Sequence, residues 1–237
     1  MGSAPRSGTV RCVRRDAQRN REAVLAAARE IYAEQGVEAP LDVIARRAGV
    51  GNATLYRRFP DRASLIEAVF HDMLTATVEA GEEARRAEDP WSGLISYVER
   101  LFTGLAADRG ATDLLTTGVE GLPTLDALHA HNAETFRGLL ARCVREGTAR
   151  DDLSVEDLLF ALAVVGRAVP AAEAASPGSW RRLLALFVDG LRKEGASPLP
   201  AEPLNGEQLA GALRELHGRR GREAGSGAGG AGGSGRG

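Results

Sequence analysis

One eight-residue stretch, NATLYRRF, combines amide, hydroxyl and guanidinium groups at the spacing of a helical face. In a helix over 52–59, Leu55 and Phe59 share the inner side, while Ala53 and Arg57 point the opposite way. Asn and Arg side chains can bond base edges in a DNA major groove, and an Ala methyl can touch a thymine methyl group. Hydroxyl and cationic groups beside them can hold phosphates. The candidate DNA-contact residues are Gly51, Asn52, Ala53, Thr54, Tyr56, Arg57, Arg58 and Arg62.

The preceding segment is expected to position this helix. Leu41, Ile44 and Ala48 recur at helical spacing, so 41–48 forms a short helix with one apolar face. Gly49 then supplies the left-handed conformation of a tight turn. Two short helices meeting at a sharp angle form a helix-turn-helix. An ordinary helical hairpin with a solvated charged face would have a similar composition.

The block from Arg21 to Phe70 resembles the DNA-binding domain of the TetR/AcrR (tetracycline-repressor-like) family of bacterial regulators. The resemblance rests on AAAREIYAEQGVE followed by IARRAGVGNATLYRRFPDRASLIEAVF. It implies backbone contacts for some residues and base contacts for others. The backbone set is Thr54, Tyr56 and Arg62, and the base set is Asn52, Ala53, Arg57 and Arg58.

The chain departs from the family pattern at the start of the second helix. The family usually has Thr or Ser where this chain has Ala39 and Pro40, so a capping hydroxyl is missing. Pro40 still pre-sets the dihedral of a first helical turn. The family often has His at Arg58 and Lys at Arg62, and both changes keep or add positive charge.

Composition indicates a soluble globular protein with a full core. The 237 residues are 43% hydrophobic and 26% charged, with two cysteines. We expect no membrane span, no secretory signal and therefore a cytoplasmic protein. No catalytic, cofactor or metal-ligand motif stands out, so we expect no enzyme activity, no cofactor and no metal.

Charge is distributed unevenly along the chain. Residues 1–70 carry 12 arginines against 8 acidic residues, whereas residues 71–200 carry 13 basic residues against 20 acidic ones. Duplex DNA is a polyanion that attracts the first segment and repels the second. The positive charge is thus concentrated where the DNA-contact residues lie.

Helical periodicity throughout predicts an all-α fold with a three-helix DNA-binding domain, a linking helix and a C-terminal helical domain. The linking helix follows Asp61 and continues to about Glu83. The first helix is expected from Asn20, after either a minor-groove arm or an untethered terminus. A weak helix is possible at 207–217. The expected divisions are a flexible basic arm (1–16), a DNA-binding domain (17–70), an effector-binding and dimerisation domain (71–195) and a disordered Pro/Gly-rich tail (196–237).

Two amphipathic helices, over 94–105 and 125–143, are candidates for an effector site. Asn132 falls within the apolar stripe of the second helix, and His129 lies at its margin. A ligand can satisfy such polar groups, but so can a neighbouring helix or a buried water. The composition favours a moderately hydrophobic small molecule. The candidate lining residues are Tyr97, Leu101, Phe102, His129, Asn132 and Phe136.

The helices over 154–169 and 177–191 carry more apolar surface than one core requires, which favours a homodimer. The family usually dimerises through its last two helices. Candidate interface residues are Leu158, Leu162, Val165, Leu184, Phe187 and Leu191. The sequence therefore indicates a dimeric, effector-released repressor on a pseudo-palindromic operator. The alternative is a constitutive dimeric DNA-binding protein without an effector.

Overall fold

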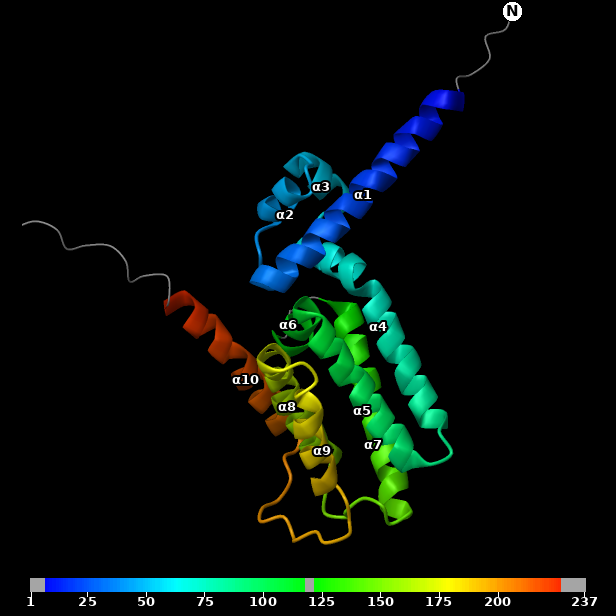
Figure 1. Cartoon of the computed structure of the whole chain (residues 1–237), viewed down its shortest axis with the longest axis vertical. Helices are drawn as coiled ribbons and strands as arrows, with labels where there is room; N and C mark the ends of the chain where they lie inside the picture. Colours follow the sequence, from blue (N-terminus) through cyan, green and yellow to red (C-terminus); the bar gives the residue numbers. More distant parts are fainter. Residues whose placement is uncertain (1–6, 118–121, 227–237) are drawn as a thin grey trace, which may run out of the picture.

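The computed structural model describes residues 7–117 and 122–226 of the 237. Over these residues the chain is helical and has no strand, which confirms the predicted all-α class (Figure 1). The helices are α1 (Ser7–Gln35), α2 (Leu41–Arg47), α3 (Asn52–Arg58), α4 (Arg62–Arg86), α5 (Pro90–Ala107), α6 (Arg109–Thr117), α7 (Pro123–Arg145), α8 (Val155–Ala175), α9 (Trp180–Gly190) and α10 (Gly206–Ser226).

Side-chain caps define where several of these helices begin. Asp61 accepts a hydrogen bond from the Ser64 amide at 2.7 Å at the start of α4. Asp89 caps α5, and Ser154 forms a reciprocal capping box with Asp157 at the start of α8. Each cap satisfies amides that a helix leaves without internal partners. These short polar segments therefore set the points at which the chain changes direction.

The first hydrophobic core extends past the predicted domain boundary at residue 70. It contains the buried faces of α1 to α4 and also Ala111, Leu114, Leu122, Leu125 and Leu128. A second core begins at Ala80 and joins α4, α5, α7, α8 and α9. Packing therefore places α6 and the first turns of α7 with the N-terminal helices.

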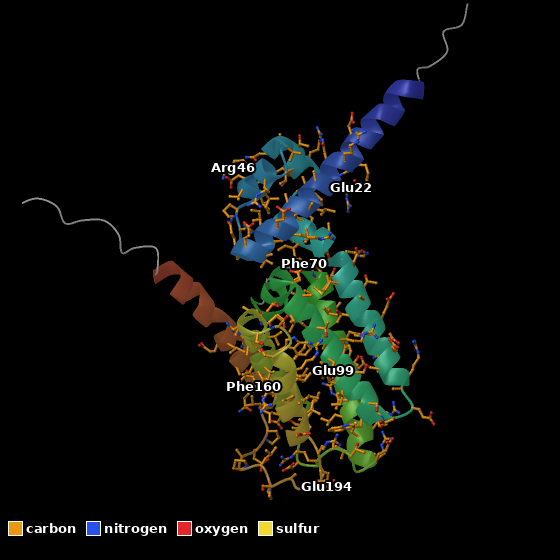
Figure 2. All side chains as sticks on the ribbon, viewed as in Figure 1. Glu22, Arg46, Phe70, Glu99, Phe160 and Glu194 are labelled. Carbon is orange, nitrogen blue, oxygen red and sulfur yellow. The ribbon has the colours of Figure 1, made fainter. Side chains whose placement is uncertain are left out.

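Helix α6 joins the two halves because it packs against α1, α5, α8 and α10. Its approach to α1 and α4 is close at Gly110. A methyl group at this position would lie 3.1 Å from Phe70 and 3.2 Å from Tyr32. Phe70, labelled in Figure 2, lies at the junction between the N-terminal helices and the bundle below. A glycine is thus what allows the two halves to touch here.

Both ends of the chain are more helical than predicted. Helix α1 begins at Ser7, so residues 7–16 extend a long helix and do not form a flexible arm. Adding residues to an existing helix costs little, even without an apolar period. The predicted disordered tail contains α10, which packs on α8 and α6 and buries Leu209. The remaining parts of these two predictions, residues 1–6 and 227–237, lie outside the described residues.

Helix α8 is apolar on most of its surface. By length and composition alone it could cross a membrane, but the core helix of a soluble protein has the same length and composition, so this is weak evidence for a span. Only 22% of that stretch is buried within the chain. A helix that packs on a second polypeptide can also have this composition, because its apolar surface is covered only in the assembly.

Candidate nucleic-acid interface and regulatory core

The turn between α2 and α3 has the geometry of a helix-turn-helix. Gly49 has φ of 68°, a left-handed conformation that a glycine adopts without strain. The Val50 amide donates to the Ala45 carbonyl at 3.1 Å, closing the turn. Leu55 and Phe59 are buried against the first core, as predicted. The inner face of α3 is thus fixed, and its outer face is turned to solvent.

Seven of the eight predicted DNA-contact residues lie together on α3 or at its N-cap. Tyr56 is 50% exposed, and Thr54 is half-buried. Helix α3 has no acidic residue in its first turn and ends in Arg57 and Arg58. This surface presents an amide, a phenol and two guanidinium groups with no carboxylate on the same helix. The exposed members besides Tyr56 are Gly51, Asn52, Ala53, Arg57 and Arg58.

Arg62 differs from the other seven because it is engaged within the fold. Its Nη1 donates to the carbonyls of Val37 and Ala39, at 2.7 Å each. Its Nε lies 4.0 Å from a carboxylate oxygen of Glu38. These bonds fix the loop before α2, where Pro40 provides no side-chain cap. Arg62 therefore stabilises the loop, and its contact with a DNA phosphate stays a prediction.

A small cavity between α1 and α3 brings in residues that the sequence reasoning missed. Its volume is about 130 Å³. Asn20 and Arg21 line it from α1, opposite Thr54, Arg57 and Arg58 of α3. Helical spacing could have identified these α1 residues, since residues 17, 20, 21 and 24 share one face of the helix and all line this cavity.

The predicted effector residues between α5 and α7 are packed against one another. The rings of Tyr97 and Phe136 are 5.1 Å apart, and both side chains are buried. The Tyr97 hydroxyl donates to Asn132 Oδ1 at 2.6 Å. Burial raises the pKa of Tyr97. The side-chain oxygen of Asn132 is therefore bonded by a neighbouring helix, one of the alternatives left open by the sequence.

The remaining members of that set lie apart from this pair. Phe102 is buried and meets Trp180 edge-on at 6.2 Å, while Leu101 is half-buried. His129, at the margin of the stripe, is exposed over the residue as a whole, although burial of its ring lowers its pKa. Its role in an effector site stays a prediction. A residue at the margin of a helical stripe can turn outward with a small rotation of the helix. None of the six lines the cavity between α1 and α3, the groove between α8 and α9, or the hollows beside Asp151 and beside His71.

Two polar groups on the α4-facing side of α7 escaped the sequence reasoning. Among the described residues, His131 Nε2 and Thr135 Oγ1 are buried and lack a hydrogen-bond partner. The His131 ring lies against α4 at Gly81. A buried polar atom without a partner is costly, so these atoms are candidates for bonding to a guest molecule.

The predicted dimerisation helices expose a different face from the one we expected. Leu158, Leu162, Leu184 and Leu191 are buried in the second core of the same chain. Sequence alone cannot distinguish a core stripe from a surface stripe on a helix that is apolar nearly all round. The other two candidates, Val165 and Phe187, are half-buried.

The exposed apolar surface lies beside that buried stripe. Val164 on α8 is 44% exposed, and Leu186 on α9 is 67% exposed. Leu183 on α9 is 36% exposed, and Ala161, Leu186 and Phe187 line a groove of about 380 Å³ between α8 and α9. We call Ala161, Val164, Leu183, Leu186 and Phe187 the α8–α9 apolar face.

Potential metal ligands are dispersed over residues 7–117 and 122–226. No group of three potential metal ligands occurs among these residues. Cys143 is buried, and burial raises the pKa of its thiol, so the thiolate nucleophile is disfavoured.

Two family descriptions match separate parts of the chain. Residues 24–69 match "Bacterial regulatory proteins, tetR family", and residues 89–193 match "Transcriptional regulator SbtR-like, C-terminal domain". No curated protein matches the chain. The recognised N-terminal part includes α2, α3 and the start of α4, which are the elements that position the exposed face described above.

Three solved structures are similar to this chain. A TetR transcription regulatory protein from Mycobacterium vanbaalenii is 34% identical, covering 76% of this chain and 99% of that one, with a TM-score of 0.45. A gamma-butyrolactone receptor is 18% identical, covering 88% of this chain and 99% of that one, with a TM-score of 0.56. A regulator FadR from Bacillus subtilis, solved with stearoyl-CoA, is 19% identical, covering 72% of this chain and 99% of that one, with a TM-score of 0.55.

The last two structures share only the fold with this chain. The first is also similar in sequence, at 34% identity over 76% of this chain. With the family matches and the exposed helix-turn-helix, these findings identify the class of protein. This chain belongs to the TetR family of DNA-binding, helix-turn-helix transcriptional regulators.

Proposed function

We propose that this regulator is a homodimeric repressor that binds a pseudo-palindromic operator and is released by a small-molecule effector. The observation that carries the proposal is an exposed recognition helix on a chain that leaves a large apolar face uncovered. A single helix-turn-helix reads one half-site, so a dimer is needed to read two half-sites about one DNA turn apart.

The α8–α9 apolar face supports a homodimer. Leu186 and Val164 lie on neighbouring helices, and most α8 residues are only partly buried by their own chain. Contiguous exposed apolar surface on a soluble protein indicates an interaction site. Two copies that pair through α8 and α9 would bury it in a four-helix arrangement.

The α3 surface supports separate roles in DNA binding. Asn52, Ala53, Arg57 and Arg58 are exposed and would meet base edges if α3 lies in a major groove. Thr54 and Tyr56 flank these residues and would bond the sugar-phosphate backbone, which fixes the register of the helix. Gly51 precedes them at the N-cap and leaves room for close approach of a DNA strand.

The effector proposal rests on polar groups in the apolar space around α7. The Tyr97–Asn132 hydrogen bond offers a donor and an acceptor that a guest can exchange for its own. Thr135 lies one turn along the helix and lacks a partner among the described residues. These groups favour a moderately hydrophobic molecule with a few hydrogen-bonding atoms. The FadR structure of Bacillus subtilis, which contains stearoyl-CoA, shows that this fold accommodates a ligand.

The packing between α5 and α7 favours the alternative, in which the dimer binds DNA without an effector. Tyr97 and Phe136 fill the space where an effector would bind. An effector would therefore have to displace the Tyr97 side chain, and the energy for this must come from its preferential binding to the displaced state. The two functions thus differ in whether a second state of this core exists.

The proposed mechanism is a population shift transmitted through α4. This helix spans both cores, from Leu65 in the first to Ala84 in the second. A displacement at its far end would change the separation of the two recognition helices. Groove spacing is fixed by the duplex, so a small change in separation prevents simultaneous binding of both half-sites.

The test is to map bound DNA across the genome of the source organism and measure binding of the recovered site. A two-fold symmetric site bound by two chains is expected. Arg57→Ala should reduce the preference for that site over unrelated DNA by about 1–3 kcal/mol if Arg57 makes a bidentate base contact. Equal binding of symmetric and unrelated DNA by the parent protein would contradict the proposal.

A further inference from the structure

The cavity between α1 and α3 is lined by three guanidinium groups and no acidic residue. Arg21 comes from α1, and Arg57 and Arg58 come from α3. Asn20 and Thr54 add an amide and a hydroxyl to the same lining. Several cationic and neutral donors around a small space of about 130 Å³ match the donor requirement of an oxyanion.

Within the described part of the chain, these three arginines form no ion pair. The carboxylate nearest in sequence to Arg21, that of Glu22, accepts a hydrogen bond from Gln18 at 2.8 Å. Arg58 is oriented by a bond to the Ala17 carbonyl at 3.5 Å, which leaves its charge uncompensated. The cavity is therefore a concentrated positive site without an internal counter-ion.

The position of the cavity selects which anion can reach it. It lies at the edge of α3 that faces α1, and α1 runs past α3 with its N-terminal turns projecting beyond the helix-turn-helix (Figure 1). A helix lying in a major groove has a phosphodiester backbone along each side. The group that meets the α1 side of α3 is therefore a backbone phosphate.

We infer that the α1–α3 cavity binds one phosphate of the DNA backbone and that Arg21 is a DNA-positioning residue outside the helix-turn-helix. This inference rests on the proposed placement of α3 in the major groove. Arg57 and Arg58 then have a second function, because the charge that they present to bases also draws a phosphate toward Asn20 and Arg21. The long first helix thereby fixes the angle at which α3 enters the groove.

The experiment measures the salt dependence of binding to a duplex of arbitrary sequence, about 30 base pairs long, between roughly 50 and 200 mM NaCl. Losing one phosphate contact lowers the slope of log affinity against log salt by about 0.9. Arg21→Ala should show this change, so its affinity should fall about 3.5-fold less than that of the parent across this range. Arg21→Lys should restore most of the slope, because the charge is kept.

Two further variants separate a local contact from a loss of net charge. Asn20→Asp places a carboxylate in the cavity without changing its shape, and it should weaken duplex binding at low salt. Arg145→Ala removes an exposed arginine near the end of α7, and it should leave the slope unchanged. Circular dichroism of each variant verifies that the helices are retained.

Different failures point to different errors. An unchanged slope in Arg21→Ala, with normal binding by the parent, would overturn the inference and leave the function of α3 intact. Saturable binding of inorganic phosphate that is lost in Arg21→Ala, with an unchanged DNA slope, would assign the cavity to a free anion and also overturn it. Failure of the parent to bind any duplex would overturn the proposed function and this inference together.

Discussion

Replacing Arg62 with Ala separates two explanations of the same residue. The family resemblance assigns Arg62 to a DNA phosphate, whereas the structure shows its guanidinium bonded to the carbonyls of Val37 and Ala39. If the structural bonds dominate, the substitution destabilises the loop between α1 and α2. DNA binding should then weaken only to the extent that the domain unfolds.

The expected loss of stability follows from these two bonds. Both N···O distances are 2.7 Å, and the donor is charged. A hydrogen bond to a charged group contributes about 1.5–3 kcal/mol. The two bonds come from one side chain that is 31% exposed, so their contributions are not additive and solvent reduces them. We expect Arg62→Ala to lower the free energy of unfolding by about 2–4 kcal/mol.

Urea unfolding followed by circular dichroism measures this change, and duplex titration is carried out at concentrations where both proteins are folded. Arg57→Ala is the matched control, because Arg57 is exposed and its loss should change stability by less than about 0.5 kcal/mol. Arg62→Lys should recover part of the stability with a single donor group. An unchanged unfolding free energy combined with a salt slope lowered by about 0.9 would refute the structural explanation and support a phosphate contact.

Three other substitutions test the cores and the apolar face. Burial raises the pKa of Tyr32 to about 12, so folding stability present below pH 10 should fall as the pH rises from 10 to 12. Tyr32→Phe should remove that fall, which is about 1.4 kcal/mol per pH unit. It should also raise stability at pH 7 by about 1 kcal/mol, because the buried hydroxyl lacks a partner among the described residues. The same dependence of unfolding free energy on alkaline pH in both proteins would contradict this. Leu186→Glu should yield folded monomers in sedimentation, whereas Val78→Glu, at an exposed site on α4, should not; a dimer in both would place the interface elsewhere. Asn132→Leu should lower stability by about 1–3 kcal/mol by leaving the Tyr97 hydroxyl unpaired, yet retain operator binding and block effector release; normal release would place the effector site elsewhere.

The parts predictable from sequence were those governed by local periodicity. Leu55 and Phe59 were assigned to the inner face of α3 because a helix turns by a fixed angle per residue. The partners of Arg62 lie 23 and 25 residues away, and no local pattern encodes such a contact. The same applies to the Tyr97–Asn132 bond, whose residues are 35 positions apart. Long-range partners of polar groups were therefore the main omission.

Helix α8 shows a second limit of sequence reasoning. Its apolar residues surround the helix, so periodicity gave no preferred direction. Leu158 and Leu162 were assigned to the dimer interface, but tertiary packing uses them in the core of the same chain. Val164 is exposed although its side chain has the same chemical character. The distinction depends on where α5 and α7 lie, which only the assembled fold defines.

The continuity of the first core across α6 has a consequence for building hybrid regulators. A fusion cut after residue 70 would transplant α1 to α3 and the start of α4 without Ala111, Leu114 and Leu125, which complete their hydrophobic packing. The donor domain would then present an open apolar surface to a foreign sensor that has no reason to fit it. A graft that includes α6 and the first turns of α7 keeps this packing intact and moves the junction into the second core. The transplantable specificity unit of this regulator is therefore assembled from two separate stretches of the chain.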